Sequence, residues 1–358
     1  MKKTALYEKH VQAGAKIVEF AGYFMPIQFR GIIDEHKRVR STVGIFDVSH
    51  MGEFFVSGKG ARDFVQKMTL NDVNKLFPGR AQYSGMCYEH GGMIDDLIVY
   101  QRENDYMLIV NAANRIKDWD WLHSHKTPDV ELRDRSDELT LVAVQGPDAE
   151  STLQSLTSTD LSQIKFYHFT EDKLAGIPMI ISRTGYTGEP GFELCFDTES
   201  SDIVYDAIIK AGDPFQIEPI GLGARDTLRL EMKYCLYGND LDEKTNPLEA
   251  GLGWITKLDK GDFIGRDALL KVKTEGIRRK LIGFTMLERA FPRHGYVLAQ
   301  NGHAIGVVTS GTVSPMLDRG IGMGYVPKEL SSVGTELDVQ VRNRTFRAQI
   351  VETPFYKK

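Results

Sequence analysis

The segment that most limits the fold of this 358-residue chain is Gly91–Tyr100, an apolar stretch that follows a Gly-Gly turn and carries two adjacent carboxylates, Asp95 and Asp96. The pattern predicts a strand, and neighbouring side chains on a strand point to opposite faces. Both faces are otherwise apolar, so we expect both to be covered. A carboxylate beside a core needs a partner and can have a shifted pKa, as catalytic acids and bases often do. This segment alone favours a plainer interpretation, in which Asp95 or Asp96 binds backbone donors of the turn.

Further strands flank this segment. Residues Arg80–Tyr88 read as a strand before the turn, and Tyr106–Asn114 read as another strand that ends in amides. Short polar turns separate the strands, which is typical of an antiparallel meander. The meander brings Tyr83, Asp96 and Asn111 within plausible reach of one another. Phenol, carboxylate and amide groups suit a small polar heterocycle better than a metal or a phosphate.

Composition excludes several classes of protein. A length of 358 residues suggests two or three domains, and 42% hydrophobic with 26% charged residues is the balance of a soluble globular protein. A net charge of -5 argues against nucleic acid as a partner. The three cysteines are far apart, which indicates neither a zinc site nor a disulfide framework and favours reduced thiols in a cytoplasm. The chain has neither a signal-peptide pattern nor an apolar run of 18 residues, so we expect no membrane association.

The first 275 residues read as an α+β region in which hairpins join the strands. We expect helices over residues 6–13, 33–43, 58–68, 116–125 and 149–156. The segment 44–52 is expected to run into a strand, and 139–147 is expected to be a buried strand that breaks at Gly-Pro. From residue 278 onward six short strands follow in about eighty residues, which predicts a small closed barrel or a sandwich. The charged segment Lys271–Gly276 is the expected linker, and Thr309–Pro315 is expected to be a polar loop of the barrel.

A second group of functional side chains lies in the glycine-rich segment Ser182–Leu194, which follows a predicted strand and leads into another. Its glycines do not have the spacing of a dinucleotide-binding loop. The residue types fit a plain hairpin turn and a binding site equally well. Arg183, Tyr186, Glu189 and Glu193 are many functional groups for a turn, and a carboxylate can bind a guanidine-like pair of N–H groups in bidentate fashion.

A third group lies on the helix predicted after Glu218-Pro219. Its buried stripe would comprise Ala224, Leu228, Met232 and Cys235. Arg225 lies in the first turn, where a cation opposes the helix dipole, so it is better explained by a ligand or a buried carboxylate. For Arg229 we weigh such a role evenly against a solvated position on the helix surface.

Taken together, these segments resemble one family along essentially the whole chain. The segments are Gly44–Gly52, Gly91-Gly92 with Asp95-Asp96, Ser182–Leu194, Gly221–Glu231, Asn246–Trp254 and Val308–Pro315. They are similar to those of the aminomethyltransferase of the glycine cleavage system, the T-protein. Each motif is moderately specific, and their order and combination are highly specific.

The resemblance implies a cloverleaf of three domains around a central folate site, the third being the C-terminal β-barrel at 278–358. The folate-binding region 1–275 would have two interleaved parts, about 1–50 with 138–275, and 51–137. The implied enzyme transfers the one-carbon unit from the aminomethyl-lipoyl arm of H-protein to tetrahydrofolate. The products would be 5,10-methylenetetrahydrofolate, ammonia and the dihydrolipoyl H-protein. Tetrahydrofolate would be the acceptor substrate, and we expect no metal, flavin or NAD.

The resemblance also implies roles for individual residues. Asp96 matches the key acid of the family, which would bond the N10 region of the folate and assist ring closure. Pocket positions around it match Met51, Tyr83 and Asn111, and positions around the pterin match Tyr167, Tyr186, Glu193 and Arg225. Tyr167 has a neighbouring aromatic alternative in Phe166. The basic contact for the glutamate tail would be Lys357 or Lys358.

Three alternatives remain open on the sequence. A demethylase-type folate module is normally fused to a flavin domain, and this chain has no flavin-binding segment. A folate-binding accessory protein for iron–sulfur assembly carries a Lys-Gly-Cys type motif, which is absent from the sequence. A plain α+β binding module would use the same pocket without catalysis, and only an assay separates it from the enzyme.

Overall fold

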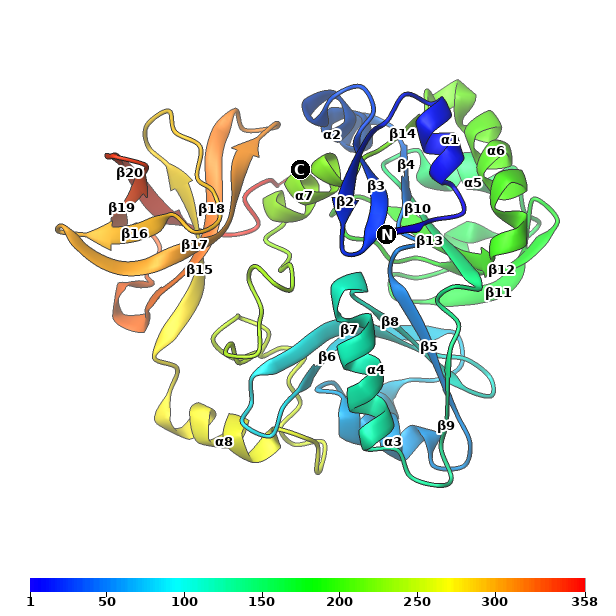
Figure 1. The fold of residues 1–358 in the computed structure, drawn as a ribbon, viewed down its shortest axis with the longest axis horizontal. Helices are drawn as coiled ribbons and strands as arrows, with labels where there is room; N and C mark the ends of the chain where they lie inside the picture. Colours follow the sequence, from blue (N-terminus) through cyan, green and yellow to red (C-terminus); the bar gives the residue numbers. More distant parts are fainter. Residues whose placement is uncertain (358) are drawn as a thin grey trace. The chain divides into compact units, whose positions relative to one another are not determined.

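The computed structural model describes residues 1–357 (Figure 1). The chain divides into two compact units. The first comprises residues 1–66, 72–84 and 97–225, and the second comprises 67–71, 85–96 and 226–358. The mixed helix-and-sheet class and the C-terminal barrel are confirmed. The division of residues 1–275 into two interleaved parts stays a prediction.

The largest sheet of the first unit has the strand order β11-β12-β13-β10-β4-β14. The strands span Phe169–Leu174, Ile177–Ser182, Gly191–Asp197, Leu139–Gln145, Gly44–Asp47 and Glu218–Pro219, respectively. All seven residues of β10 are buried, as expected for a central strand with both faces covered. Apolar side chains of β10 and β13 pack in one core with those of α5 (Ala149–Gln154) and α6 (Ser201–Gly212).

A smaller sheet at the N-terminus has the order β1-β3-β2, with strands Lys2–Lys3, Tyr23–Gln28 and Lys16–Phe20. Helix α1 (Tyr7–Gln12) precedes β2, and α2 (Ile32–Ser41) follows β3. The segment 44–52 begins with β4, which ends at Asp47, and runs into β5, which begins at Gly52. The backbone turns between them, and the N–H of Met51 donates to the carbonyl of Val48.

The third sheet has the order β6-β7-β8-β5-β9, and the predicted meander is therefore confirmed. The strands span Arg80–Cys87, Met93–Gln101, Tyr106–Val110, Gly52–Ser57 and Glu131–Asp134. The boundary between the two units passes through β6 and β7. Helices α3 (Ala61–Met68) and α4 (Arg115–Ser124) lie close to their predicted positions. The prediction that the third strand continues to Asn114 is wrong, since β8 ends at Val110 and a short 3₁₀ helix, Ala112–Asn114, follows Asn111.

In the second unit a closed six-stranded barrel has the order β15-β18-β17-β16-β19-β20. Its strands span Arg279–Met286, Arg319–Pro327, His303–Ser314, Val297–Gln300, Glu336–Val341 and Arg344–Val351. Alternate residues of β15, namely Ile282, Phe284 and Met286, enter its core. The predicted loop Thr309–Pro315 is wrong except for its last residue, because β17 continues to Ser314 and pairs with β18 over that length.

Two further corrections concern helices of the chain. The expected linker Lys271–Gly276 lies largely within α8 (Arg266–Glu275), which ends at Gly276 with a φ of 85°. Leu269 of this helix is buried, whereas Lys271, Lys273 and Glu275 are exposed, so the charges mark the exposed side of a helix. Helix α7 spans Leu222–Glu231, and Met232 of the predicted buried stripe lies just beyond its end and is only half-buried. Within residues 1–357 no helix is both long and apolar enough to cross a membrane.

Candidate active site

Glu193 is the best-defined carboxylate of the candidate site. It lies on β13 opposite Ser182 of β12, and its side chain is 8% exposed. The Thr184 hydroxyl donates to its carboxylate, and the Tyr100 hydroxyl lies 3.3 Å from that of Thr184. Burial raises the pKa of Glu193, while the bond from Thr184 and the charge of Arg225 oppose the rise. A buried acceptor on a rigid strand pair is therefore held beside a cation.

Arg225 and Tyr186 are in direct contact. The guanidinium of Arg225, in the first turn of α7, lies 4.6 Å from the centre of the Tyr186 ring. This is a cation–π geometry. The charge of Arg225 also acts on Glu193 and on His50. The structure thus brings together three of the predicted residues, Tyr186, Glu193 and Arg225, from the glycine-rich loop, β13 and α7.

Buried side chains hold the glycine-rich loop in place. Arg40 forms an ion pair of 2.9 Å with Glu189 and donates to the carbonyl of Thr187 at 2.7 Å. The Gln145 amide donates to the carbonyl of Thr184 at 3.0 Å and accepts from the Thr187 hydroxyl at 2.9 Å. A Cβ on Gly185 would lie 2.0 Å from the Gln145 side-chain oxygen, so a larger residue there would displace the amide that holds the loop. Glu189, which the sequence placed among candidate site groups, is engaged with Arg40.

His50 is a neighbour of Arg225 that the sequence did not single out. It is 3% exposed and lies edge-on to Phe20 and Tyr23, with ring centroids 5.5 and 6.5 Å away. Burial and the charge of Arg225 lower its pKa to about 4, against the opposing effect of Asp47. His50 is therefore neutral at neutral pH. The histidines are scattered along the sequence, so the spacing of His50 gave no indication of this environment.

Tyr167 has a left-handed backbone, with a φ of 59°. Its N–H donates to the carbonyl of Arg183 at 3.0 Å, and its carbonyl accepts from Ala81 at 2.9 Å. Tyr167 itself is half-buried, whereas Phe166, the alternative aromatic, is 65% exposed. A non-glycine residue held in this conformation is a feature of functional sites, although by itself it does not assign one.

Asp95 and Asp96 are the third and fourth residues of β7 rather than its first residues. Asp95 is fully buried and Asp96 is half-buried, on opposite faces of the strand. Asp96 belongs to the second unit, where its charge contributes to the raised pKa of the Cys235 thiol, an effect dominated by burial. Met51, Tyr83 and Asn111 are half-buried residues of the first unit. Their juxtaposition with Asp96 stays a prediction.

Arg229 is not solvated, because its side chain is only 1% exposed. It forms an ion pair of 2.8 Å with the buried Asp240, which the sequence did not single out. Lys357, one candidate for the glutamate tail, lies 3.5 Å from Glu352, and Lys358 lies outside the described residues. Among residues 1–357 no group of three or more His, Cys, Asp or Glu side chains is arranged to hold a metal.

The chain matches two family models over almost its whole length. Residues 6–260 match the GCVT N-terminal domain, and residues 279–357 match the glycine cleavage T-protein C-terminal barrel domain. An aminomethyltransferase of Bacteroides thetaiotaomicron is 55% identical over 100% of both chains. One from Halothermothrix orenii is 49% identical over 99% of this chain and 100% of that relative.

A solved structure agrees with these sequence matches. The glycine cleavage system aminomethyltransferase T from Bartonella henselae has a TM-score of 0.93 and 34% identity, covering 99% of this chain and 98% of that one. The chain therefore belongs to the glycine cleavage T-protein family and is a tetrahydrofolate-dependent aminomethyltransferase.

Proposed function

We propose that this enzyme takes the one-carbon unit from the aminomethyl-lipoyl arm of H-protein and transfers it to tetrahydrofolate. The products are 5,10-methylenetetrahydrofolate, ammonia and the dihydrolipoyl arm. The observation that carries this proposal is the buried Glu193 carboxylate, held by Thr184 beside Arg225 and Tyr186. This donor and acceptor set matches the edge of a pterin ring, whose guanidine-like N–H groups a carboxylate binds in bidentate fashion.

The folate already carries the nucleophilic nitrogens, so the chain has to position substrates, exclude water and move a proton. Asp96 is the proposed acid/base group near folate N10, with Met51, Tyr83 and Asn111 around it. Tyr167 and Tyr186 would flank the pterin, while Arg225 balances the charge of Glu193. His50 is neutral beside Arg225, so it can orient its neighbours without adding a second cation that would compete with Arg225 for the Glu193 carboxylate.

The proposed partner is the lipoyl-bearing H-protein. Because its arm is long and flexible, a transient interface of modest area is enough to deliver the substrate. Free aminomethyl-dihydrolipoate is therefore expected to be the poorer substrate. A cytoplasmic location remains a prediction of the composition.

Glu193→Gln tests the pterin assignment, because it keeps the shape of the side chain and removes its charge. We expect tetrahydrofolate binding, measured by calorimetry, to weaken by about 10- to 100-fold, which corresponds to the loss of a charge-assisted hydrogen bond. Glu171→Gln is the matched control, since this carboxylate is exposed and binds Arg102. Unchanged folate affinity in Glu193→Gln would remove Glu193 from the pterin site.

A further inference from the structure

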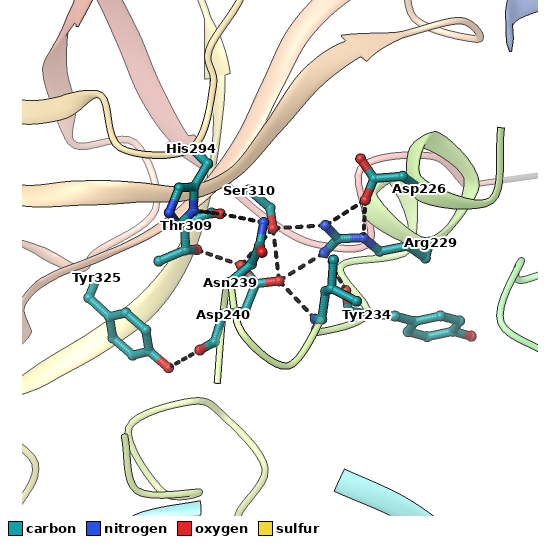
Figure 2. A network of polar contacts seen from close by, with 10 residues as sticks. Asp226, Arg229, Tyr234, Asn239, Asp240, His294, Thr309, Ser310 and Tyr325 are labelled. Carbon is teal, nitrogen blue, oxygen red and sulfur yellow. Dashed lines mark hydrogen bonds and ion pairs between the residues drawn. The ribbon is translucent and has the colours of Figure 1, made fainter. Parts of the chain in front are cut away.

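A buried ionic network in the second unit extends from the Arg229–Asp240 ion pair (Figure 2). Its centre is the carboxylate of Asp240. One oxygen accepts from Arg229 at 2.8 Å, from the backbone N–H of Leu236 at 2.9 Å and from Ser310 at 2.9 Å. The other oxygen accepts from Thr309 at 2.5 Å and lies 2.8 Å from the Ser310 hydroxyl, whose single proton the two oxygens share. This carboxylate is therefore fully engaged by charged, hydroxyl and backbone donors.

The network joins three separate elements of the chain. Arg229 comes from the last turn of α7, Asp240 comes from the loop 232–241 that follows it, and Thr309 and Ser310 come from β17 of the barrel. Figure 2 shows the Arg229 guanidinium between Asp226 on one side and Asp240 with Ser310 on the other. The backbone carbonyl of Asp240 also accepts from the Tyr325 hydroxyl at 2.8 Å. The loop is thus fixed against both the helix and the barrel.

The end of this loop and the residues that follow it, 237–245, hold the beginning of β7. The Tyr237 hydroxyl donates to the carbonyl of Met93 at 2.9 Å. The N–H of Met93 donates to the carbonyls of Asp242 and Thr245 at 3.2 and 3.0 Å. The residue before it, Gly92, packs so closely that a Cβ there would lie 1.8 Å from the carbonyl oxygen of Glu243. The start of this strand is consequently clamped by residues 237–245.

We propose that Asp240 and Tyr237 are positioning residues for Asp96. Asp96 lies three residues after Met93 on the same strand, about 10 Å along it. The Asp240 network fixes the loop, and residues 237–245 fix Met93. The position of Met93 in turn sets the position of the Asp96 carboxylate on the same strand. The inference rests on the proposed role of Asp96 in aminomethyl transfer. It adds that the position of the Asp96 carboxylate depends on an ionic network anchored in the barrel.

Two considerations support a positioning role over a purely stabilising one. A buried ion pair contributes little net stability compared with an apolar replacement, because desolvation offsets the attraction. It does fix geometry, since every donor and acceptor must be satisfied in one arrangement. A displacement of about 1 Å at a reacting group can cost up to 10²-fold in rate.

Tyr237→Phe is the direct test, because it removes one hydroxyl and leaves the Asp240 network intact. We expect kcat for ammonia release from aminomethylated H-protein to fall about 10-fold, with the KM for tetrahydrofolate changed less than 2-fold. Tyr325→Phe is the matched comparison, since it also removes one hydroxyl-to-carbonyl bond from the same loop. Its loss in kcat is expected to be smaller, because Tyr325 bonds the carbonyl of Asp240, whereas Tyr237 bonds Met93 itself.

Two further measurements separate position from stability. Hydrogen exchange at the Met93 amide should be faster in Tyr237→Phe than in Tyr325→Phe, while both variants melt at similar temperatures. Asp240→Asn should also lower kcat, together with the melting temperature, because it leaves Arg229 without its buried counter-charge. A lower melting temperature in these variants without a fall in kcat that exceeds the change in KM would overturn the proposal.

The double variant with Asp96→Asn separates this inference from the proposed function. If Tyr237 acts through Asp96, Tyr237→Phe should cost almost nothing more in the Asp96→Asn background. An equal loss in both backgrounds would overturn the positioning role and leave the role of Asp96 standing. Full activity of Asp96→Asn would instead overturn the proposed function of Asp96, and this inference with it.

Discussion

At the scale of single residues, Asp95 and Asp96 differ in burial and therefore in expected role. Asp96→Asn keeps the size of the side chain but removes its charge and its ability to accept a proton. Loss of a positioned acid or base typically costs about 10²–10⁴-fold, so we expect kcat to fall in that range with folate affinity changed less. Asp95→Asn should change turnover little and lower the melting temperature, because Asp95 is fully buried. The reverse pattern, measured by steady-state kinetics and thermal melting, would contradict the assignment.

His50 provides a prediction for pH dependence. Burial, Arg225 and Asp47 together set its pKa at about 4 in the folded protein, below the ordinary value of 6.5. The unfolded chain therefore binds more protons than the folded chain between these two values, and stability falls as pH falls from about 6.5 to about 4. A shift of this size corresponds to about 3 kcal/mol when fully expressed.

His50→Phe tests this linkage, because a ring of similar shape lies between Phe20 and Tyr23 without titrating. Melting temperatures measured from pH 7 to pH 4 should fall less steeply in the variant than in the parent protein. Parallel curves for the two proteins would show that His50 is not the group whose protonation destabilises the fold.

Single residues also show what the sequence could and could not predict. The residue types of the glycine-rich segment indicated a possible site, and the structure does bring Tyr186 near Arg225. Arg229 could not be placed, because its partner Asp240 lies on a loop whose position depends on the distant strand β17. His50 was missed for the same reason, because its contacts with Phe20, Tyr23 and Arg225 join residues far apart in the chain.

At the scale of elements, hydrophobic alternation predicted the strands of the meander well. It failed in polar and charged segments that belong to a strand or a helix. The polar run Thr309–Pro315 resembles a loop, yet most of it is strand β17 because Thr309, Ser310 and Ser314 have buried partners. The charged run before Gly276 resembles a linker, yet it forms the exposed face of α8. In both cases tertiary contacts decide what the local pattern leaves ambiguous.

Gly92 gives an element-scale prediction about the start of β7. Gly92→Ala would place a Cβ 1.8 Å from the Glu243 carbonyl, so the clamp on this strand must move. We expect a loss of about 1–3 kcal/mol, in the range for overpacking. Gly253→Ala is the matched control, because its Cβ would meet Leu248 at 3.7 Å, an ordinary contact. Equal melting temperatures for the two variants would contradict the close packing at Gly92.

At the scale of the whole molecule, the sequence identified the family and the fold class, and the comparisons bear both out. The family resemblance came from several moderate motifs in a fixed order. Composition and periodicity alone reached only an α+β region followed by a small closed barrel or a sandwich. Asp96 belongs to one compact unit, and Glu193 and Arg225 belong to the other. The kinetic tests of these proposed residues therefore use the full chain.

The most direct test of the central claim is a single-turnover reaction of the full-length protein with H-protein whose aminomethyl carbon is labelled with ¹³C. With tetrahydrofolate present, we predict that ammonia and labelled 5,10-methylenetetrahydrofolate appear in equal amounts. Omission of tetrahydrofolate or replacement of H-protein by free aminomethyl-dihydrolipoate should slow the release of ammonia greatly. Ammonia release at the same rate without tetrahydrofolate, or no transfer of the label when all components are present, would contradict the account.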